Sequence, residues 1–321
     1  MERKLIAVVA AFTPEQRARI AAAAEGHGFT ARFFENADQA GPELHDAEIL
    51  LTNMADLAKQ APKLRWFCSS NAGVDPFLKP DAFASPDAVL TNSSGAYGVT
   101  IAEHILMVCL EILRRQADYN AIVARRVWKR DLPIRSIKGS RITLLGTGDI
   151  GREAAVRLRA FGPASLTGVN RRGANPGGLF DRVVTIDRLD DVLPETDLLI
   201  MSLPGTPETA GLLSAARIAL LPETAYVVNV GRGTAIDQKA LEAALREGRL
   251  AGAALDVFER EPLPADDTLW ECPNLLLTPH VAGNTTLPYT VERIVEMFLE
   301  DFDNYCAGRP LSHLVDRKRG Y

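Results

Sequence analysis

The stretch RITLLGTGDIGREAAVRLRAFG, residues 141–162, constrains the fold more than any other part of the chain. An apolar run leads into three glycines, Gly146, Gly148 and Gly151, and a helical pattern follows at once. Gly146 would permit a tight turn, Gly148 would let a pyrophosphate approach the backbone, and Gly151 would let the helix pack close to the strand. This order predicts the dinucleotide-binding part of an open parallel α/β sheet.

The next predicted strand, SLTGVN, ends at Asn170, nineteen residues after Gly151. An acidic residue at this strand end would accept hydrogen bonds from the ribose 2′-hydroxyl of NAD but repel the 2′-phosphate of NADP. Asn170 removes that repulsion, and Arg171 and Arg172 offer forked donors suited to a phosphate. The sequence therefore predicts that NADP(H) is preferred and NAD(H) possible. The alternative is that the two arginines lie in a solvated loop.

Apolar runs alternate with helical segments in both halves of the chain, which predicts parallel βαβ units. The expected strands are LIAVVAAF, TARFF, AEILLTN, LRWFCSS and AVLTN in the first half, then RITLLG, SLTGVN, LLIMSLP, AYVVNVG, AGAALDVF and LLLTPH in the second. One long helix is expected from Val99 to about Arg126, and a final helix ends near Gly308.

The predicted fold class is α/β, with two doubly wound, Rossmann-like domains that have parallel sheets and a cleft between them. Residues 1–97 plus 289–321 are expected to form a discontinuous, flavodoxin-like substrate (catalytic) domain. Residues 98–288 are expected to form the dinucleotide-binding Rossmann domain.

Composition narrows the range of partners. The net charge of −5 and the absence of long runs of like charge give no reason to expect nucleic acid, and no apolar stretch approaches the ~20 residues of a membrane span. The start MERK followed by LIAVVAAF superficially resembles a secretory signal, but the short apolar run leads directly into TPEQRARI, which favours a first strand. The partners are expected to be small molecules.

The cysteines favour a reducing, cytoplasmic location. They are scattered, with no CxxC pair and no Cys/His ligand spacing, so neither a disulfide framework nor a metal site is predicted. These residues are Cys68, Cys109, Cys272 and Cys306.

Three strand ends in the second half carry reactive side chains. NVGRGTAID supplies Arg232, LLLTPHVAGNT supplies His280, and LDVFEREPLP supplies Asp256, Glu259 and Glu261. An Arg could hold a substrate carboxylate, a His could move a proton near neutral pH, and a Glu beside that His could fix its tautomer. Each residue alone is more often structural or solvated, but their convergence at strand ends predicts a proton-transfer site beside a hydride carrier. The remaining histidines are interpreted as structural: His27, His45, His104 and His313.

Ordered motifs carry a resemblance to a known family over nearly the whole chain. They are NAGVD at 71–75, AEHILMVCLEILRR at 102–115, GTGDIG at 146–151, LPGTPETAGLL at 203–213, NVGRG at 229–233, LDVFEREPLP at 255–264 and LTPHVAG at 277–283. The chain resembles the D-isomer-specific 2-hydroxyacid dehydrogenases, and Asn170 makes it look like their NADP-preferring glyoxylate and hydroxypyruvate reductases. The resemblance implies an oxidoreductase that acts on the CH–OH group of D-2-hydroxy acids without a metal.

The resemblance also implies roles for individual residues. Arg232 would bind the substrate carboxylate and keto oxygen, and His280, paired with Glu261, would be the proton donor and acceptor. The backbone of residues 71–73 would receive the substrate carboxylate, and Asp256 would orient the nicotinamide carboxamide. The implied substrate loop is Asn71, Ala72 and Gly73. The implied cofactor-binding residues are Gly146, Gly148, Asp149, Ile150, Gly151, Asn170, Arg171, Arg172, Leu203, Thr209, Val230, Asp256 and Gly283.

Several alternatives stay open. Trp128 could enter a neighbouring subunit's cleft, as an aromatic residue does in some relatives, or could simply pack; the helix that begins at AEH resembles the family's contact in a homodimer. Phosphoglycerate dehydrogenase is disfavoured because no extra basic cluster or regulatory domain is visible, and formate dehydrogenase because Glu261 replaces the Gln of that branch. A dinucleotide-sensing protein like the corepressors of this fold, and a structural role without a cofactor, are the other hypotheses.

Overall fold

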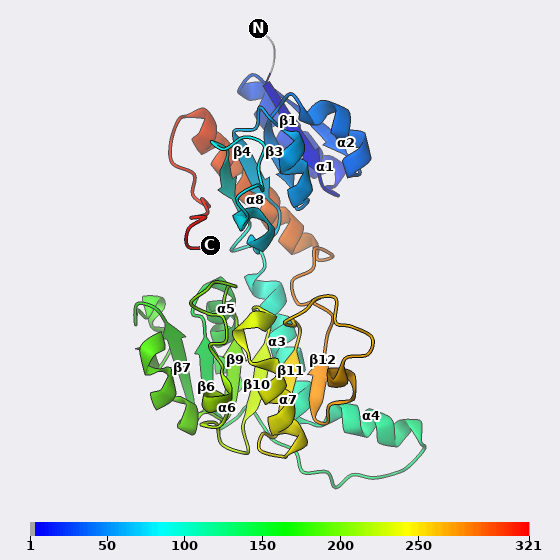
Figure 1. Ribbon diagram of the computed structural model, residues 1–321, viewed down its shortest axis with the longest axis vertical. Helices are drawn as coiled ribbons and strands as arrows, with labels where there is room; N and C mark the ends of the chain where they lie inside the picture. Colours follow the sequence, from blue (N-terminus) through cyan, green and yellow to red (C-terminus); the bar gives the residue numbers. More distant parts are fainter. Residues whose placement is uncertain (1–3, 321) are drawn as a thin grey trace. The chain divides into compact units, whose positions relative to one another are not determined.

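The computed structural model describes residues 4–320, which form two compact units. Unit 1 comprises the described residues up to Tyr97 together with 285–320, and unit 2 comprises Gly98–Asn284. Each unit contains one parallel sheet, of five and of seven strands (Figure 1), which confirms the predicted α/β class. The assignment of substrate binding to one domain and dinucleotide binding to the other stays a prediction.

Unit 1 has the strand order β2-β1-β3-β4-β5, the order of flavodoxin-like folds. Its strands are β1 (Lys4–Val9), β2 (Phe29–Phe34), β3 (Ala47–Thr52), β4 (Trp66–Ser69) and β5 (Val89–Thr91). Its helices are α1 (Pro14–Gly26), α2 (Ala37–Leu44) and α8 (Pro288–Cys306).

Helix α8 covers the sheet of unit 1 although it lies far from it in sequence. Trp66 of β4 stacks on Phe298 and on Tyr305 of α8, with ring centroids 5.3 and 5.5 Å apart. Trp66 and Phe298 are buried, and aromatic rings of this size contribute much of the stabilisation of a core. Burial of these rings therefore holds the C-terminal helix in the same unit as the first five strands.

Unit 2 has the strand order β12-β11-β10-β9-β6-β7-β8. In Figure 1 the labelled strands lie side by side in the order β7, β6, β9, β10, β11 and β12. The strands are β6 (Arg141–Leu145), β7 (Ser165–Asn170), β8 (Arg182–Thr185), β9 (Leu198–Met201), β10 (Tyr226–Asn229), β11 (Gly252–Leu255) and β12 (Leu275–Leu277). The helices are α3 (Gly98–Leu113), α4 (Gln116–Ala124), α5 (Asp149–Arg159), α6 (Ala215–Ile218) and α7 (Gln238–Arg246).

The sheet of unit 2 reverses its direction of growth between β6 and β9. The chain proceeds from β6 outward through β7 and β8, then returns to β9 on the other side of β6. Ligands of open α/β sheets bind beyond the carboxyl ends of the strands at such a reversal. The glycine turn that follows β6 therefore lies where a dinucleotide site is expected.

Two details of the predicted elements were wrong. Strand β8 was missed because it is a short edge strand in which only Val184 is fully buried, so no alternating pattern marks it. The long helix from Val99 to Arg126 is two helices, α3 and α4, separated at Arg115, whose φ is +56°. The break lacks Gly and Pro, and the Arg115 side chain stabilises it by donating to Asp118 at 2.7 Å.

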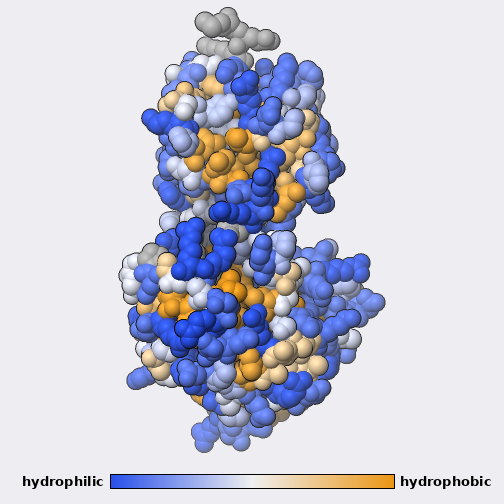
Figure 2. Space-filling model, turned by 60° about the vertical axis from the view of Figure 1, so that its left-hand side comes forward, coloured by the Kyte–Doolittle hydropathy of each residue, from blue (hydrophilic) through white to orange (hydrophobic). Residues whose placement is uncertain are grey.

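Other features of the described residues bear on partners. No helix of residues 4–320 is long and apolar enough to cross a membrane. Within the same residues, no group of three or more His, Cys, Asp or Glu side chains is arranged to hold a metal ion. On the face drawn in Figure 2, hydrophilic side chains predominate on each unit, and apolar side chains gather in patches.

Candidate active site

Three neighbouring strands of unit 2 bring the predicted reactive residues to one edge of the sheet. Strands β10, β11 and β12 run parallel and adjacent. Arg232 follows the end of β10, Glu261 follows β11, and His280 follows β12. Since carboxyl ends of parallel strands share an edge, these three side chains come from the edge that open α/β sheets use for ligands.

The imidazole of His280 is paired with Glu261. Nδ1 of His280 lies 2.6 Å from Oε2 of Glu261, and the other carboxylate oxygen, Oε1, accepts the backbone N–H of Phe258 at 2.9 Å. The His280 side chain is half exposed. Because Glu261 engages Nδ1, Nε2 is the ring nitrogen left to exchange a proton with a ligand.

The backbone at His280 is held in an unusual conformation. His280 has φ +52°, a left-handed conformation that costs a residue with a side chain about 1–3 kcal/mol. Its N–H donates to the carbonyl of Asp256 at 2.8 Å. The two N–H groups that follow, those of Val281 and Ala282, donate to the Asp256 carboxylate at 2.9 and 3.0 Å. These three bonds fix the turn that presents the imidazole.

Asp256 thus has a structural task that sequence reasoning missed. Its side chain is 2% exposed, and it also accepts the hydroxyl of Thr278 at 2.6 Å. Both carboxylate oxygens are therefore engaged by the loop that carries His280. The predicted contact of Asp256 with the nicotinamide carboxamide stays a prediction.

His104 contacts the loop that carries His280, which the sequence interpretation did not predict. Its Nε2 lies 3.2 Å from Oγ1 of Thr278 and 3.7 Å from Oδ1 of Asp256. A signal was present in the sequence, because His104 lies three residues after Ile101 and four before Val108, on the buried face of α3.

Arg232 follows a turn that its neighbours shape. The buried Asn229 side chain accepts the N–H of Gly231 at 3.0 Å and donates to the carbonyl of Arg232 at 2.9 Å. Nη1 of the half-buried Arg232 side chain donates to the carbonyl of Gly231 at 2.8 Å. A Cβ on Gly233 would lie 1.9 Å from the carbonyl carbon of Phe258, so the turn after β10 packs tightly against the segment that leads to Glu261.

The glycine turn between β6 and α5 fits a dinucleotide. Gly146 has φ +100°, which glycine adopts readily, and a Cβ on Gly151 would lie 2.0 Å from the Gly146 carbonyl oxygen. A Cβ on Gly148, in contrast, would meet no atom within 4 Å. Gly148 therefore leaves open space at the N-terminus of α5, where the helix dipole favours a phosphate.

This contrast gives a paired prediction. Gly151→Ala forces backbone atoms apart and is expected to destabilise the protein by about 1–3 kcal/mol, measured as a lower thermal midpoint without ligand. Gly148→Ala should leave that midpoint near the wild-type value but weaken dinucleotide binding, because the methyl group occupies the phosphate space. Calorimetric titration and thermal melts measure both. Equal dinucleotide affinity in Gly148→Ala and wild type would contradict the assignment.

The end of β7 is shaped by Asn170. Its amide nitrogen donates to the Thr147 hydroxyl and to the Ala174 carbonyl, each at 2.8 Å, while its Oδ1 accepts the N–H of Arg172 at 2.9 Å. Asn170 thereby folds the loop that carries Arg171 and Arg172, whose side chains are exposed. No carboxylate stands at residues 170–172.

The loop after β9 lies within electrostatic reach of Arg171. The pKa of Glu208 is lowered chiefly by a hydrogen bond from its own backbone N–H and by the Thr206 side chain, and Arg171 adds to the shift. The hydroxyl of Thr209, which was predicted to bind cofactor, donates to the Pro204 carbonyl at 2.6 Å. Thr209 therefore shapes its own loop, and its contact with a cofactor stays a prediction.

The other predicted cofactor residues follow strand ends in unit 2. The carboxylate of Asp149 lies against Gly98 at the start of α3, where a Cβ would meet its Oδ2 at 2.3 Å. The buried Leu203 and Val230 follow β9 and β10. Roles in cofactor binding stay predictions for all of them, as for Ile150 and Gly283.

The predicted substrate loop lies in unit 1, directly after β4. The Asn71 carbonyl accepts the N–H of Ser93 at 3.1 Å, and the Asn92 amide donates to the Ala72 carbonyl at 2.8 Å. These bonds fix residues 71–73 at the carboxyl end of the unit 1 sheet. Their contact with substrate stays a prediction.

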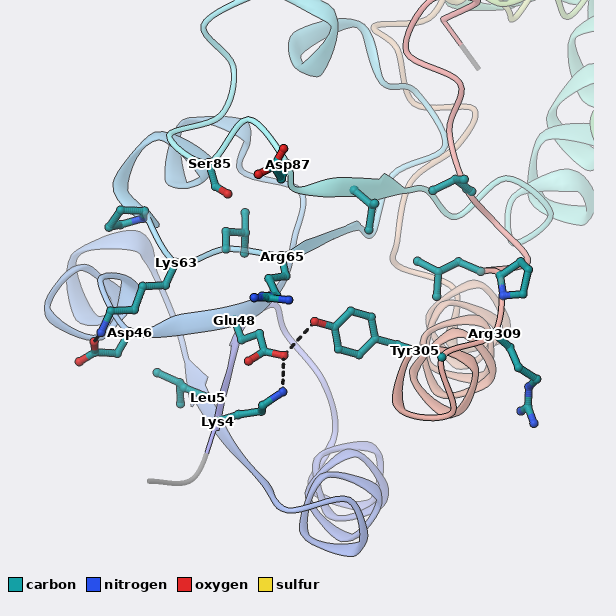
Figure 3. A pocket seen from close by; sticks show the side chains of 17 residues that line it. Lys4, Leu5, Asp46, Glu48, Lys63, Arg65, Ser85, Asp87, Tyr305 and Arg309 are labelled. Atoms are coloured by element: carbon teal, nitrogen blue, oxygen red, sulfur yellow. Dashed lines mark hydrogen bonds and ion pairs between the residues drawn. The ribbon is translucent and has the colours of Figure 1, made fainter. Parts of the chain in front are cut away.

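A hollow of about 1020 Å³ in unit 1 lies at the opposite, amino edge of its sheet (Figure 3). Glu48 of β3 accepts the Tyr305 hydroxyl at 2.8 Å and lies 3.0 Å from Nζ of Lys4, and Lys63 pairs with Asp46. Those charges compensate one another, and ligands of parallel sheets bind at the carboxyl edge. Within unit 1, the hollow therefore lies at the other edge of the sheet from the predicted substrate loop, residues 71–73.

The fold and the site together are those of a dinucleotide-binding α/β protein in which a His–Glu pair lies at the ligand-binding edge of the sheet. Residues 106–282 match the family model described as D-isomer specific 2-hydroxyacid dehydrogenase, NAD binding domain. The chain belongs to this family.

Similar proteins include a glyoxylate/hydroxypyruvate reductase A of Salmonella newport, 31% identical over 264 residues, which are 81% of this chain and 82% of that protein. A family member from Aeromonas salmonicida has a similar structure, with a TM-score of 0.87 and 32% identity over 98% of this chain and 100% of that chain. An NADPH-dependent glyoxylate/hydroxypyruvate reductase from Sinorhizobium meliloti, solved with NADP and sulfate, has a TM-score of 0.82 and 30% identity over 99% of this chain and 100% of that one.

Proposed function

We propose that this 2-hydroxyacid dehydrogenase is a reductase of small 2-oxo acids of the glyoxylate or hydroxypyruvate type, with NADP(H) as the preferred cofactor. The observation that carries the proposal is the 2.6 Å contact between His280 and Glu261 at the sheet edge that also holds Arg232 and the glycine turn. The names of the relatives from Salmonella newport and Sinorhizobium meliloti support the choice of substrate.

Each side chain has a defined part in the proposed reaction. Arg232 binds the carboxylate and the keto oxygen of the 2-oxo acid, and the backbone of residues 71–73 receives the carboxylate. The bound nicotinamide supplies or accepts the hydride. Nε2 of His280 protonates the keto oxygen during reduction and takes the proton back during oxidation, while Glu261 stabilises the imidazolium through Nδ1. The guanidinium of Arg232 and the imidazolium supply the positive charge that polarises the carbonyl.

The proposed preference for NADP(H) rests on the residues at the end of β7. Asn170 carries no charge, and its amide group donates hydrogen bonds to Thr147 and Ala174. No carboxylate at this strand end would therefore repel a 2′-phosphate. The exposed guanidinium groups of Arg171 and Arg172 would hold that phosphate by charge-assisted hydrogen bonds. NAD(H) lacks this phosphate and is expected to bind more weakly.

The deciding experiment measures initial rates of NADPH and NADH oxidation with glyoxylate, hydroxypyruvate, pyruvate and bulkier 2-oxo acids. Turnover of the two smallest substrates with NADPH preferred would support the proposal. A preference for NADH would overturn the cofactor assignment, and a preference for bulky substrates would overturn the substrate assignment. Dinucleotide binding without turnover on the whole panel would favour a sensor.

Removal of the two guanidinium groups should reverse the cofactor preference. In Arg171→Ala/Arg172→Ala, loss of hydrogen bonds to a charged phosphate, each worth about 1.5–3 kcal/mol, should raise KM for NADPH by at least about tenfold and leave KM for NADH nearly unchanged. Arg182→Gln, at the amino end of β8, removes one positive charge from the opposite edge and serves as the control. Parallel increases of both KM values would show that the arginines do not read the phosphate.

A homodimer and a cytoplasmic location remain parts of the proposal. Trp128, in the segment after α4, has 93% of its surface exposed, and the nearby Val123 and Val127 are 69% and 50% exposed. An apolar group this exposed is typical of a protein contact, which supports a second copy covering the segment. Entry of Trp128 into that copy's cleft stays a prediction.

A further inference from the structure

A chain of polar contacts links helix α3 to the loop that carries His280. Nε2 of His104 lies 3.2 Å from Oγ1 of Thr278, which donates to Oδ1 of Asp256 at 2.6 Å. The carboxylate of Asp256 in turn accepts the N–H groups of Val281 and Ala282. The side chains of His104 and Asp256 are 9% and 2% exposed, so water competes little with these contacts.

The hydroxyl of Thr278 determines which ring nitrogen of His104 carries a proton. A threonine hydroxyl has one proton, and that of Thr278 is donated to the carboxylate. Nε2 of His104 must therefore donate to the Thr278 oxygen rather than accept from it. Burial lowers the pKa of His104, which favours the neutral ring, although Asp256 and Glu111 act in the opposite direction. The neutral ring is thus the Nε2–H tautomer.

The contacts end at a strained part of the backbone. His280 lies directly before the two N–H groups that Asp256 holds, and its φ is +52°. A left-handed conformation of this kind persists only where surrounding bonds maintain it. A rotation of the Asp256 carboxylate would loosen both N–H bonds and let the imidazole move away from Glu261.

We propose that His104 is a positioning residue for proton transfer: its Nε2–H holds the Thr278 hydroxyl toward Asp256 and thereby fixes the backbone that aims His280. This inference rests on the proposed function, because it assigns His104 a part in the same reaction. His104 touches neither substrate nor cofactor in this role and acts through His280 alone.

Four variants test the proposal. His104→Leu and Thr278→Val remove a hydrogen-bonding group from the chain of contacts while keeping similar volume. His104→Gln and Thr278→Ser keep a side-chain N–H donor and the hydroxyl, respectively. We expect the first pair to lower kcat by about 10- to 100-fold, as misplacement of a catalytic group does, with KM for the 2-oxo acid close to the wild-type value. The second pair should retain most of kcat.

A measurement without substrate or cofactor keeps the test independent of turnover. Amide hydrogen exchange at Val281 and Ala282 should be faster in His104→Leu and Thr278→Val than in wild type, and restored in His104→Gln and Thr278→Ser. Wild-type protein that turns over no 2-oxo acid would refute the proposed function, and the exchange rates would still report on the contacts.

Two results would overturn the positioning role. One is that wild-type protein turns over 2-oxo acids while His104→Leu and Thr278→Val keep both the wild-type kcat and the wild-type exchange rates. The other is a loss of thermal stability and activity that is equal in His104→Leu and His104→Gln, which would make His104 a packing residue.

Discussion

In His280→Gln, kcat for 2-oxo acid reduction should fall by about 10²- to 10⁴-fold, the usual contribution of a positioned general acid. Glutamine cannot deliver a proton near neutral pH, whereas Nε2 of His280 is free of Glu261 and available to do so. The dinucleotide Kd should stay near the wild-type value, because the glycine turn follows β6 and His280 follows β12. Steady-state rates and a binding titration measure the two effects.

Glu261 provides a second arm of the same test. Glu261→Gln keeps an oxygen near Nδ1 of His280 but removes the negative charge that would stabilise an imidazolium in the proposed reaction, so kcat should also fall. If Glu261 acts through His280, adding Glu261→Gln to His280→Gln should cause little further loss. Independent, additive losses would show that Glu261 has another role. A His280→Gln enzyme with kcat near the wild-type value would refute the assignment of His280.

Arg232→Ala should lower kcat/KM for the 2-oxo acid by about 10²- to 10³-fold, the loss seen when a donor to a developing oxyanion is removed. In the proposed reaction the guanidinium would supply both a forked contact to the carboxylate and charge near the keto oxygen. Arg232→Lys keeps the charge without the fork, so it should recover only part of the loss. Thermal midpoints should fall only slightly, because the side chain's bond to the Gly231 carbonyl is lost while the bond from the Asn229 amide to the Arg232 carbonyl still holds the turn.

A substrate without a carboxylate distinguishes this binding role of Arg232 from a general structural one. Reduction of a simple aldehyde that lacks a carboxylate should be less sensitive to Arg232→Ala than reduction of glyoxylate. Equal losses for both substrates would mean that Arg232 does not bind the carboxylate. Full recovery in Arg232→Lys would mean that a point charge suffices.

Much of the fold was predictable because its signals are local. The glycine pattern at 146–151 marked the turn between β6 and α5, and apolar runs marked most strands of the two parallel sheets. The family resemblance, which the match to the family model confirms, rested on motifs most of which lie at strand ends. The pairing of His280 with Glu261 was expected, and the structure places their side chains in contact.

The structural features that were not predicted from the sequence have long-range causes. The break at Arg115 interrupts a continuous apolar pattern and has no Gly or Pro to signal it. Edge strand β8 buries too little to show an alternating pattern. His104 and Thr278 meet across 174 residues of sequence, and nothing in either local segment indicates the other. The task of Asp256 depends on backbone N–H groups, which every residue except proline supplies and which leave no trace in the sequence.

The anchoring of the His280 loop has a consequence for redesign. Asp256 grips Val281 and Ala282 by their main-chain N–H groups, so the identity of the side chain at 281 does not enter those bonds. Val281 is 39% exposed and directly follows His280, the proposed proton donor. Position 281 is therefore a place where mutation or directed evolution can vary bulk and polarity beside His280 while the bonds that orient the loop are retained.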